Sequence, residues 1–141
     1  MSKKGVIVII EDDEDDKDIL EMIVRDLGYT NTFKCFKYAQ DAWEYLKATH
    51  DPTFVIFCDI NLPKMTGLEF KSDLDKEPEL RKKSIPFVFF STSSNQADVD
   101  KAYTQMTVQG YFVKGSGFEE IRSTVKVILE YWSACEHPNS K

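Results

Sequence analysis

Two uninterrupted runs of apolar residues, each followed directly by acidic residues, most strongly constrain what this chain can fold into. The runs are Val6–Ile10 and Phe54–Cys58, and the acids that follow them are Glu11 with Asp12 and Asp59. A continuous apolar run of this length is typical of a strand that is buried on both faces, as strands are in a parallel sheet. The pattern therefore predicts two central parallel strands with carboxylates at their ends.

The rest of the chain continues the alternation of apolar strands with amphipathic helices. Strands are expected at about 6–10, 33–36, 54–58, 87–90 and 111–113. Apolar residues at helical spacing lie between them and after the last, where they are Ile121, Val125, Ile128, Leu129 and Trp132. Five strands that alternate with five helices predict an α/β fold, a doubly wound five-stranded parallel sheet of order 2-1-3-4-5 with helices on both faces.

Three segments between the third and fifth strands show a weaker helical periodicity of apolar residues. A third helix is expected at about 68–74, and the charged stretch 75–83 is interpreted as a solvated loop or a fraying helix. Ser93, Ser94 or Asn95 is expected to cap the fourth helix, which runs to about residue 106.

Length and charge limit the number of domains and the classes of partner. The 141 residues predict one domain, which we expect at 1–134 with a C-terminal tail at 135–141. The chain has 18 basic and 24 acidic residues and no basic face, which argues against nucleic acid or an anionic membrane as the main partner. No apolar run is long enough for a signal peptide or a membrane span, so we expect a cytoplasmic protein with reduced cysteines.

Polar residues follow the predicted strands at the edge of the sheet where ligands bind in such folds. They are Glu11, Asp12 and Asp13 after the first strand, Asp59 after the third, Ser91 and Thr92 after the fourth, and Lys114 after the fifth. Neighbouring carboxylates raise each other's pKa unless a cation joins them, and Lys114 and a divalent metal are the available cations. A few hard oxygen ligands suit Mg²⁺, which binds one or two carboxylates together with a phosphate oxygen. The sequence therefore predicts a site for an anion that arrives with magnesium.

These residues resemble the receiver domain of bacterial two-component response regulators, of the chemotaxis-receiver type with a flavodoxin-like fold. The resemblance spans about 6–132 and rests on Glu11-Asp12, Asp59-Ile-Asn-Leu-Pro-Lys-Met-Thr-Gly-Leu-Glu69, Pro86–Ser91 and Gly110-Tyr-Phe-Val-Lys114. The segment Pro-Glu-Leu-Arg-Lys-Lys before the fourth strand is similar to stand-alone regulators, including those paired with phytochrome kinases.

The resemblance implies how a phosphoryl group is received. Asp59 would be the phosphoacceptor, a nucleophile that takes the group from the phosphohistidine of a sensor histidine kinase or a histidine phosphotransfer protein. Asp12 and Asp59 would bind Mg²⁺ or Mn²⁺ directly, Asn61 through its backbone carbonyl, and Glu11 through water. Lys114 would bind a phosphoryl oxygen. Such a protein is not an enzyme beyond its own phosphorylation from a phosphodonor and slow autodephosphorylation.

The resemblance also implies a switch. Ser91 would donate its hydroxyl to the phosphoryl group, and Tyr111 would change rotamer with it. The surface of the fourth helix, fifth strand and fifth helix would then change its affinity for a downstream protein or for a second copy of the chain. Asn61 and Ser93 would flank the path of the water that removes the phosphate.

Two features depart from the family pattern. Gly115 stands where the family usually has a proline joined by a cis bond, so we expect a mobile loop at 115–117. The acid pair is extended by Asp13, Glu14, Asp15 and Asp16. We interpret these four acids as a solvated first helical turn, where negative charge favours the helix dipole, and the alternative is selectivity for a particular kinase.

Two other functions are considered. A phosphohydrolase of the haloacid-dehalogenase type also uses a strand-end aspartate, but it needs a second acid two positions on, where this chain has Asn61. A pseudo-receiver would bind a partner without phosphorylation, although this chain keeps all the residue types that phosphorylation needs.

Overall fold

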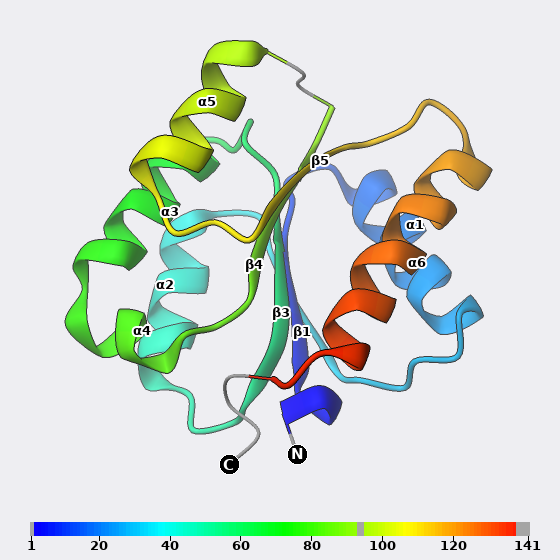
Figure 1. Ribbon diagram of the computed structural model, residues 1–141, viewed down its shortest axis with the longest axis horizontal. Coiled ribbons are helices and arrows are strands. Elements are labelled where there is room, and N and C mark those ends of the chain that lie inside the picture. The colour runs from blue at the N-terminus through cyan, green and yellow to red at the C-terminus, as the bar shows by residue number, and fades with distance from the viewer. Residues whose placement is uncertain (1, 93–94, 138–141) are drawn as a thin grey trace.

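A five-stranded parallel sheet of order β2-β1-β3-β4-β5 lies at the centre of the protein (Figure 1). The structure is a computed structural model that describes residues 2–92 and 95–137. The strands are β1 (Val6–Ile10), β2 (Phe33–Phe36), β3 (Thr53–Cys58), β4 (Phe87–Ser91) and β5 (Gly110–Val113). Every neighbouring pair is parallel. The predicted fold class, strand order and strand positions are therefore confirmed.

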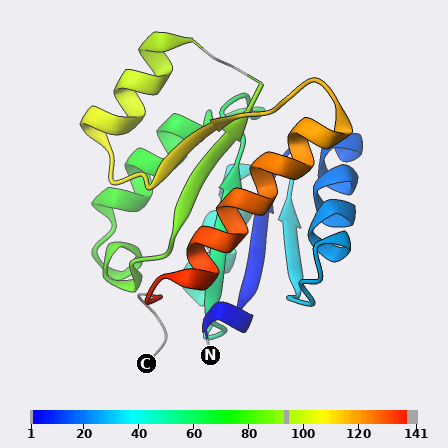
Figure 2. The same cartoon turned by 45° about the vertical axis from the view of Figure 1, so that its right-hand side comes forward.

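Helices cover both faces of the sheet (Figures 1 and 2). Helices α1 (Glu14–Asp26) and α6 (Phe118–Ala134) pack on one face. The other face is covered by α2 (Ala39–Ala48), α3 (Gly67–Lys76), α4 (Pro78–Lys83) and α5 (Gln96–Gln105). A short 3₁₀ helix, η1 (Ser2–Lys4), precedes β1. Within the described residues, no helix is long and apolar enough to cross a membrane.

The two central strands supply the core on both faces. Every residue of β1 and of β3 is buried. Alternate side chains of β1 point to opposite faces, so that Ile7 and Ile9 pack with α1 and α6 while Val8 and Ile10 pack with α2 and α3. Burial of such side chains contributes roughly 1.5–3 kcal/mol each. This apolar support fixes the strand ends that follow.

The charged stretch that we interpreted as a loop or fraying helix is ordered, and this expectation is wrong for most of it. Helix α3 continues to Lys76, and α4 follows after one residue. Three features explain α4: Glu77 accepts the Glu79 N–H as its cap, Pro78 stands in the first turn, and Leu80 is buried. The predicted fourth and fifth helices are consequently α5 and α6. Asn95 caps α5 as expected, whereas Ser93 and Ser94 lie outside the described residues.

Two residues that we assigned to a tail, Cys135 and His137, pack against the core of the fold. The ring of His137 is buried, and its Nε2 lies 2.8 Å from the carbonyl oxygen of Phe54 in β3. The ring also packs near Trp132. The contacts of His137 thereby hold the C-terminal end of α6 at the start of the central strands.

Of the three free cysteines, Cys58 is buried and the other two are half-buried.

A buried lysine joins α3 to the segment before β5. Lys71 Nζ donates to Asp75 Oδ1 at 2.8 Å and to Thr107 Oγ1 at 3.2 Å. Asp75 Oδ2 also accepts the Thr107 N–H at 2.8 Å. Burial alone would raise the pKa of Asp75, but the hydrogen bonds from Lys71 and Thr107 hold it below its usual value. The group therefore stabilises the fold only while Asp75 is ionised.

We predict that Asp75→Asn lowers the free energy of unfolding at pH 7 by about 1–3 kcal/mol, because Lys71 loses its charged partner. A carboxyl with a depressed pKa stabilises the folded state above its ordinary pKa of about 3.9, and this contribution is lost as the pH falls through the folded-state pKa. Urea unfolding should therefore show a smaller difference between variant and wild type at pH 3 than at pH 7. Asp73→Asn, an exposed carboxylate of the same helix, is the control. Equal effects of the two variants would contradict the account.

Candidate functional site

Three carboxylates meet at the edge of the sheet where the central strands end. Glu11, Asp12 and Asp59 each offer an oxygen atom, and these atoms all lie within 4.8 Å of one another. Glu11 and Asp59 are buried, whereas Asp12 is exposed. The Asp59 N–H donates to the Ile10 carbonyl at 3.0 Å, which ties the ends of β3 and β1 together. Among the described residues this is the only such group of carboxylate, histidine or cysteine side chains, and its oxygen donors could hold a divalent metal.

Lys114, the residue that follows β5, brings a positive charge to the same place. Its Nζ forms an ion pair with Glu11 and lies 3.4 Å from Asp16 Oδ2 and 3.8 Å from Asp59 Oδ2. Its side chain is only 8% exposed. The backbone N–H of Lys114 donates to the Ser91 carbonyl at 2.8 Å, so β4 and β5 fix where the side chain begins. The structure thus brings together the four predicted residues that carry charge.

Burial and charge oppose each other in the Glu11–Lys114 pair. Burial raises the pKa of Glu11 to about 7, although the ammonium of Lys114 acts in the opposite direction. Burial alone would lower the pKa of Lys114, but its hydrogen bond and charge interaction with Glu11 hold that pKa above its usual value. Lys114 therefore stays protonated at neutral pH and supplies a fixed positive charge.

The predicted switch residues lie on the neighbouring strands. Ser91 ends β4 and is fully buried. Tyr111 in β5 is half-buried, its ring centroid lies 5.9 Å from that of Phe89, and its backbone N–H donates to the Tyr103 hydroxyl at 3.0 Å. The Tyr111 ring packs with the α2–α5 side of the sheet. Ser93 falls outside the described residues.

Helix α5, strand β5 and helix α6 expose several apolar side chains to solvent. The exposed ones are Tyr103, Val113, Phe118, Val127 and Tyr131. Phe112 is half-buried, although the sequence favoured full burial of this residue, and Trp132 is buried. Tyr103 and Tyr131, whose burial cannot be decided from the sequence pattern, are therefore exposed.

The turn after β3 approaches the backbone of Asp59 closely. The Gly67 N–H donates to the Ile60 carbonyl at 2.8 Å, and a Cβ atom on Gly67 would stand 2.2 Å from the Asp59 carbonyl oxygen. Thr66 and Glu69 form a capping box that starts α3 at this point. Asn61 is exposed, and its backbone N–H donates to Asp59 Oδ1 at 3.3 Å. Gly67 is therefore required because only hydrogen fits against the Asp59 backbone.

The four acids that follow Asp12, residues 13–16, differ in their surroundings. Asp13 caps α1 by accepting the Asp16 N–H at 3.0 Å, and Glu14 and Asp15 are exposed. These residues match the expected solvated first turn. Asp16 does not, because it is half-buried and faces Lys114. Asp16 also lies in the first turn of α1, but its side chain reaches toward Lys114, and this direction could not be read from a run of identical charges.

Comparison with known proteins gives consistent matches over most of the chain. The family described as response regulator receiver domain matches residues 7–126. The chain is 30% identical to the probable methanogenesis regulatory protein FilR2 of Methanothrix harundinacea (strain 6Ac), over 90% of this chain and 83% of that protein. It is similar to the crystal structure of the phosphorylated cyanobacterial phytochrome response regulator RcpA, with a TM-score of 0.83, 26% identity and coverage of 92% of this chain and 94% of that one. The Mn²⁺-bound form of response regulator Rcp1 has the same fold, with a TM-score of 0.81 and 23% identity; the match covers 94% of this chain and 96% of that one.

We predict that Gly67→Ala destabilises the protein by about 1–3 kcal/mol, the usual cost of overpacking a tight contact. A loss of stability would be informative, because replacing glycine by alanine within a helix otherwise raises the free energy of unfolding by about 0.5–1 kcal/mol. The measurement is urea unfolding of the variant, with Gly117→Ala as the control, since a Cβ atom on Gly117 meets nothing within 4 Å. A Gly67→Ala variant as stable as wild type would show that the close approach to Asp59 is not real.

Proposed function

This chain belongs to the response regulator receiver domain family, and on that premise we propose that it is a signalling switch that accepts a phosphoryl group on Asp59. The observation that carries the proposal is the arrangement around Asp59: three carboxylates with oxygen atoms within 4.8 Å of one another, and a buried ammonium at 3.8 Å. Carboxylates held this close need positive charge, and one ammonium cannot balance them together with an incoming phosphoryl group. A metal-assisted phosphoryl acceptor fits this charge arrangement.

The proposed metal is Mg²⁺ or Mn²⁺, because the available donors are all oxygen atoms. Asp12 and Asp59 would hold it directly, Asn61 would contribute its backbone carbonyl, and Glu11 would act through water. Asp12 is the exposed member and offers access from solvent. When bound, the metal neutralises the charge that develops on the phosphoryl oxygens. The Mn²⁺-bound structure of Rcp1, a protein of the same fold, supports this choice.

The protein's own residues account for the transfer step. An oxygen of the Asp59 carboxylate attacks phosphorus as the bond from phosphorus to the donor nitrogen breaks, and that electron pair returns to the imidazole ring of the donor histidine. Lys114 exchanges its contact with Glu11 for a phosphoryl oxygen. Because Lys114 Nζ lies 3.8 Å from Asp59 Oδ2, the ammonium has to move only a short way. Because little covalent work is left to the protein, positioning and charge neutralisation suffice.

The proposed partners follow from the same step. A sensor histidine kinase or a histidine phosphotransfer protein would supply the phosphoryl group in the cytoplasm. Inward movement of Ser91 would let Tyr111 change rotamer and alter the α5, β5 and α6 surface, which a downstream protein or a second copy would bind. Asn61, two positions after Asp59, has no carboxyl group to act as general acid. We therefore propose no enzymatic turnover of external substrates beyond self-phosphorylation and slow loss of the phosphate.

We predict that incubation with Mg²⁺ and acetyl phosphate adds one phosphoryl group, detected by intact-protein mass spectrometry, and that Asp59→Asn abolishes the addition. Asp51→Asn, which changes an exposed aspartate just before β3, should be phosphorylated like wild type. Chelation of the metal should stop the reaction.

Two outcomes would contradict this proposal. A phosphoryl group that persists in Asp59→Asn would place the acceptor elsewhere, and no labelling of wild type would leave a pseudo-receiver. Repeated turnover of phosphate monoesters would instead indicate a phosphohydrolase.

A further inference from the structure

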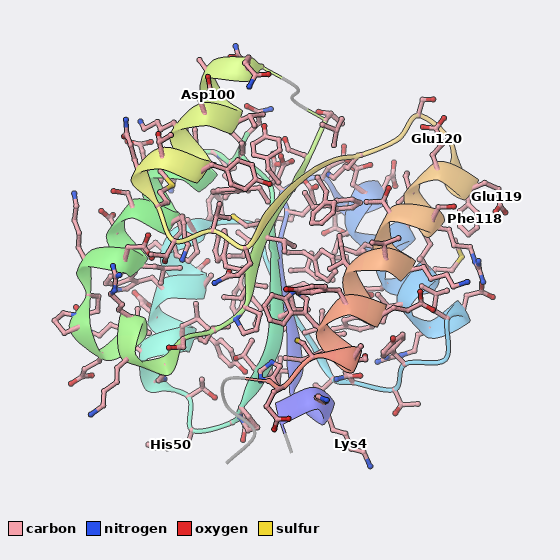
Figure 3. The ribbon with its side chains drawn as sticks, in the orientation of Figure 1. Lys4, His50, Asp100, Phe118, Glu119 and Glu120 are labelled. Carbon is pink, nitrogen blue, oxygen red and sulfur yellow. The ribbon has the colours of Figure 1, made fainter. Side chains whose placement is uncertain are left out.

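The loop that follows Lys114 is held by a side chain of the next helix. The Ser116 N–H donates to Glu120 Oε2 at 3.2 Å. Figure 3 shows Glu120 in the first turn of α6, beside the chain that arrives from β5. The loop is also tied on its other side, where the Lys114 N–H donates to the Ser91 carbonyl at 2.8 Å. The ammonium-bearing residue is therefore bracketed by two hydrogen bonds.

Gly115, between these two hydrogen bonds, lies directly against Glu120. A Cβ atom on Gly115 would stand 2.3 Å from the Glu120 Cβ and 2.4 Å from its Oε2. The Glu120 Cβ is fixed by the backbone of α6, so it cannot rotate away as the end of a flexible side chain could. Along this path only glycine fits at position 115, and proline, which also has a Cβ atom, is excluded with the other residues.

The contact has features that ordinary helix capping does not explain. The cap residue of α6 is Gly117, which has no side chain to cap the helix. In a capping box the third helical residue bonds the cap N–H, whereas Glu120 reaches one residue further back, to Ser116. Glu120 is exposed, so it has no part in the core. Its side chain is directed to the loop that carries Lys114.

We propose that Glu120 is a positioning residue for Lys114. Gly115, Ser116 and Glu120 form a clasp that fixes the loop at 115–117, which we had expected to be mobile because it lacks the proline that receiver domains usually have there. A contact between the loop and α6 thereby takes the place of the cis peptide bond to proline that usually fixes this loop in the family. This inference rests on the proposed function of Lys114 in binding the phosphoryl group, since the position of the ammonium matters only if it meets that group.

The test compares Glu120→Ala with Glu120→Gln and Glu119→Ala. Glu119 is an exposed acid of the same turn, and its side chain makes no hydrogen bond or ion pair within the described part of the chain, so its variant controls for the lost charge. The rate of phosphorylation is measured against acetyl phosphate concentration at saturating Mg²⁺. We expect Glu120→Ala to lower the maximal rate about 3- to 30-fold, because a misplacement of 1 Å can cost about 100-fold and the loss of one loop contact should shift Lys114 by less than that. Glu120→Gln, which keeps an oxygen acceptor, and Glu119→Ala should stay within about twofold of wild type.

A second readout is independent of phosphorylation. Hydrogen exchange of the Ser116 amide, followed by NMR, should accelerate in Glu120→Ala and stay slow in Glu119→Ala. If wild type is not phosphorylated at all, the proposed function fails while the exchange result still reports on the clasp. Unchanged exchange in Glu120→Ala overturns the clasp itself. Faster exchange or lower stability with an unchanged maximal rate overturns the positioning role and leaves Glu120 as a helix cap.

Discussion

Charge has to be neutralised at one edge of the sheet before the ends of the central strands can come together. Parallel strands end on the same side, so the acids after β1 and β3 are forced together, with oxygen atoms of Glu11, Asp12 and Asp59 within 4.8 Å of one another. At such distances like charges destabilise each other unless cations are present. Lys114 supplies one positive charge from β5. The remaining negative charge is what makes this edge suited to a divalent metal and an anionic group.

The fold holds these groups through backbone contacts between neighbouring elements. Asp59 is fixed by its N–H on the Ile10 carbonyl and Lys114 by its N–H on the Ser91 carbonyl. Gly67 lets the start of α3 lie against the Asp59 backbone. Each charged side chain therefore begins at a point set by the register of the sheet. The apolar cores on the two faces keep that register, because a shift by one residue would turn buried side chains toward solvent.

The sequence allowed the strands, their order and the convergence of the charged residues to be predicted, because continuous apolar runs and the topology of parallel sheets determine them. It did not reveal α4, since a short charged segment with Leu80 as its buried residue has almost no periodicity. It predicted Lys114 beside the acids but not its ion pair with Glu11, because the choice among several carboxylates depends on side-chain geometry. The roles of Asp16 and Glu120 depend on contacts between residues far apart in sequence or on a close approach of backbone, and neither leaves a pattern in the chain.

We propose that on phosphorylation the Lys114 ammonium moves from Glu11 to the group carried by Asp59, while a divalent metal binds the neighbouring carboxylates. A crystal structure of the protein with Mg²⁺ and beryllofluoride, which mimics a phosphoryl group, tests this most directly. We expect beryllium on the Asp59 carboxylate, the metal beside Asp12, and Lys114 Nζ at about 3 Å from a fluoride, within hydrogen-bond range. Lys114 still paired with Glu11 beside an unmodified Asp59, with beryllofluoride bound to another carboxylate, would contradict it.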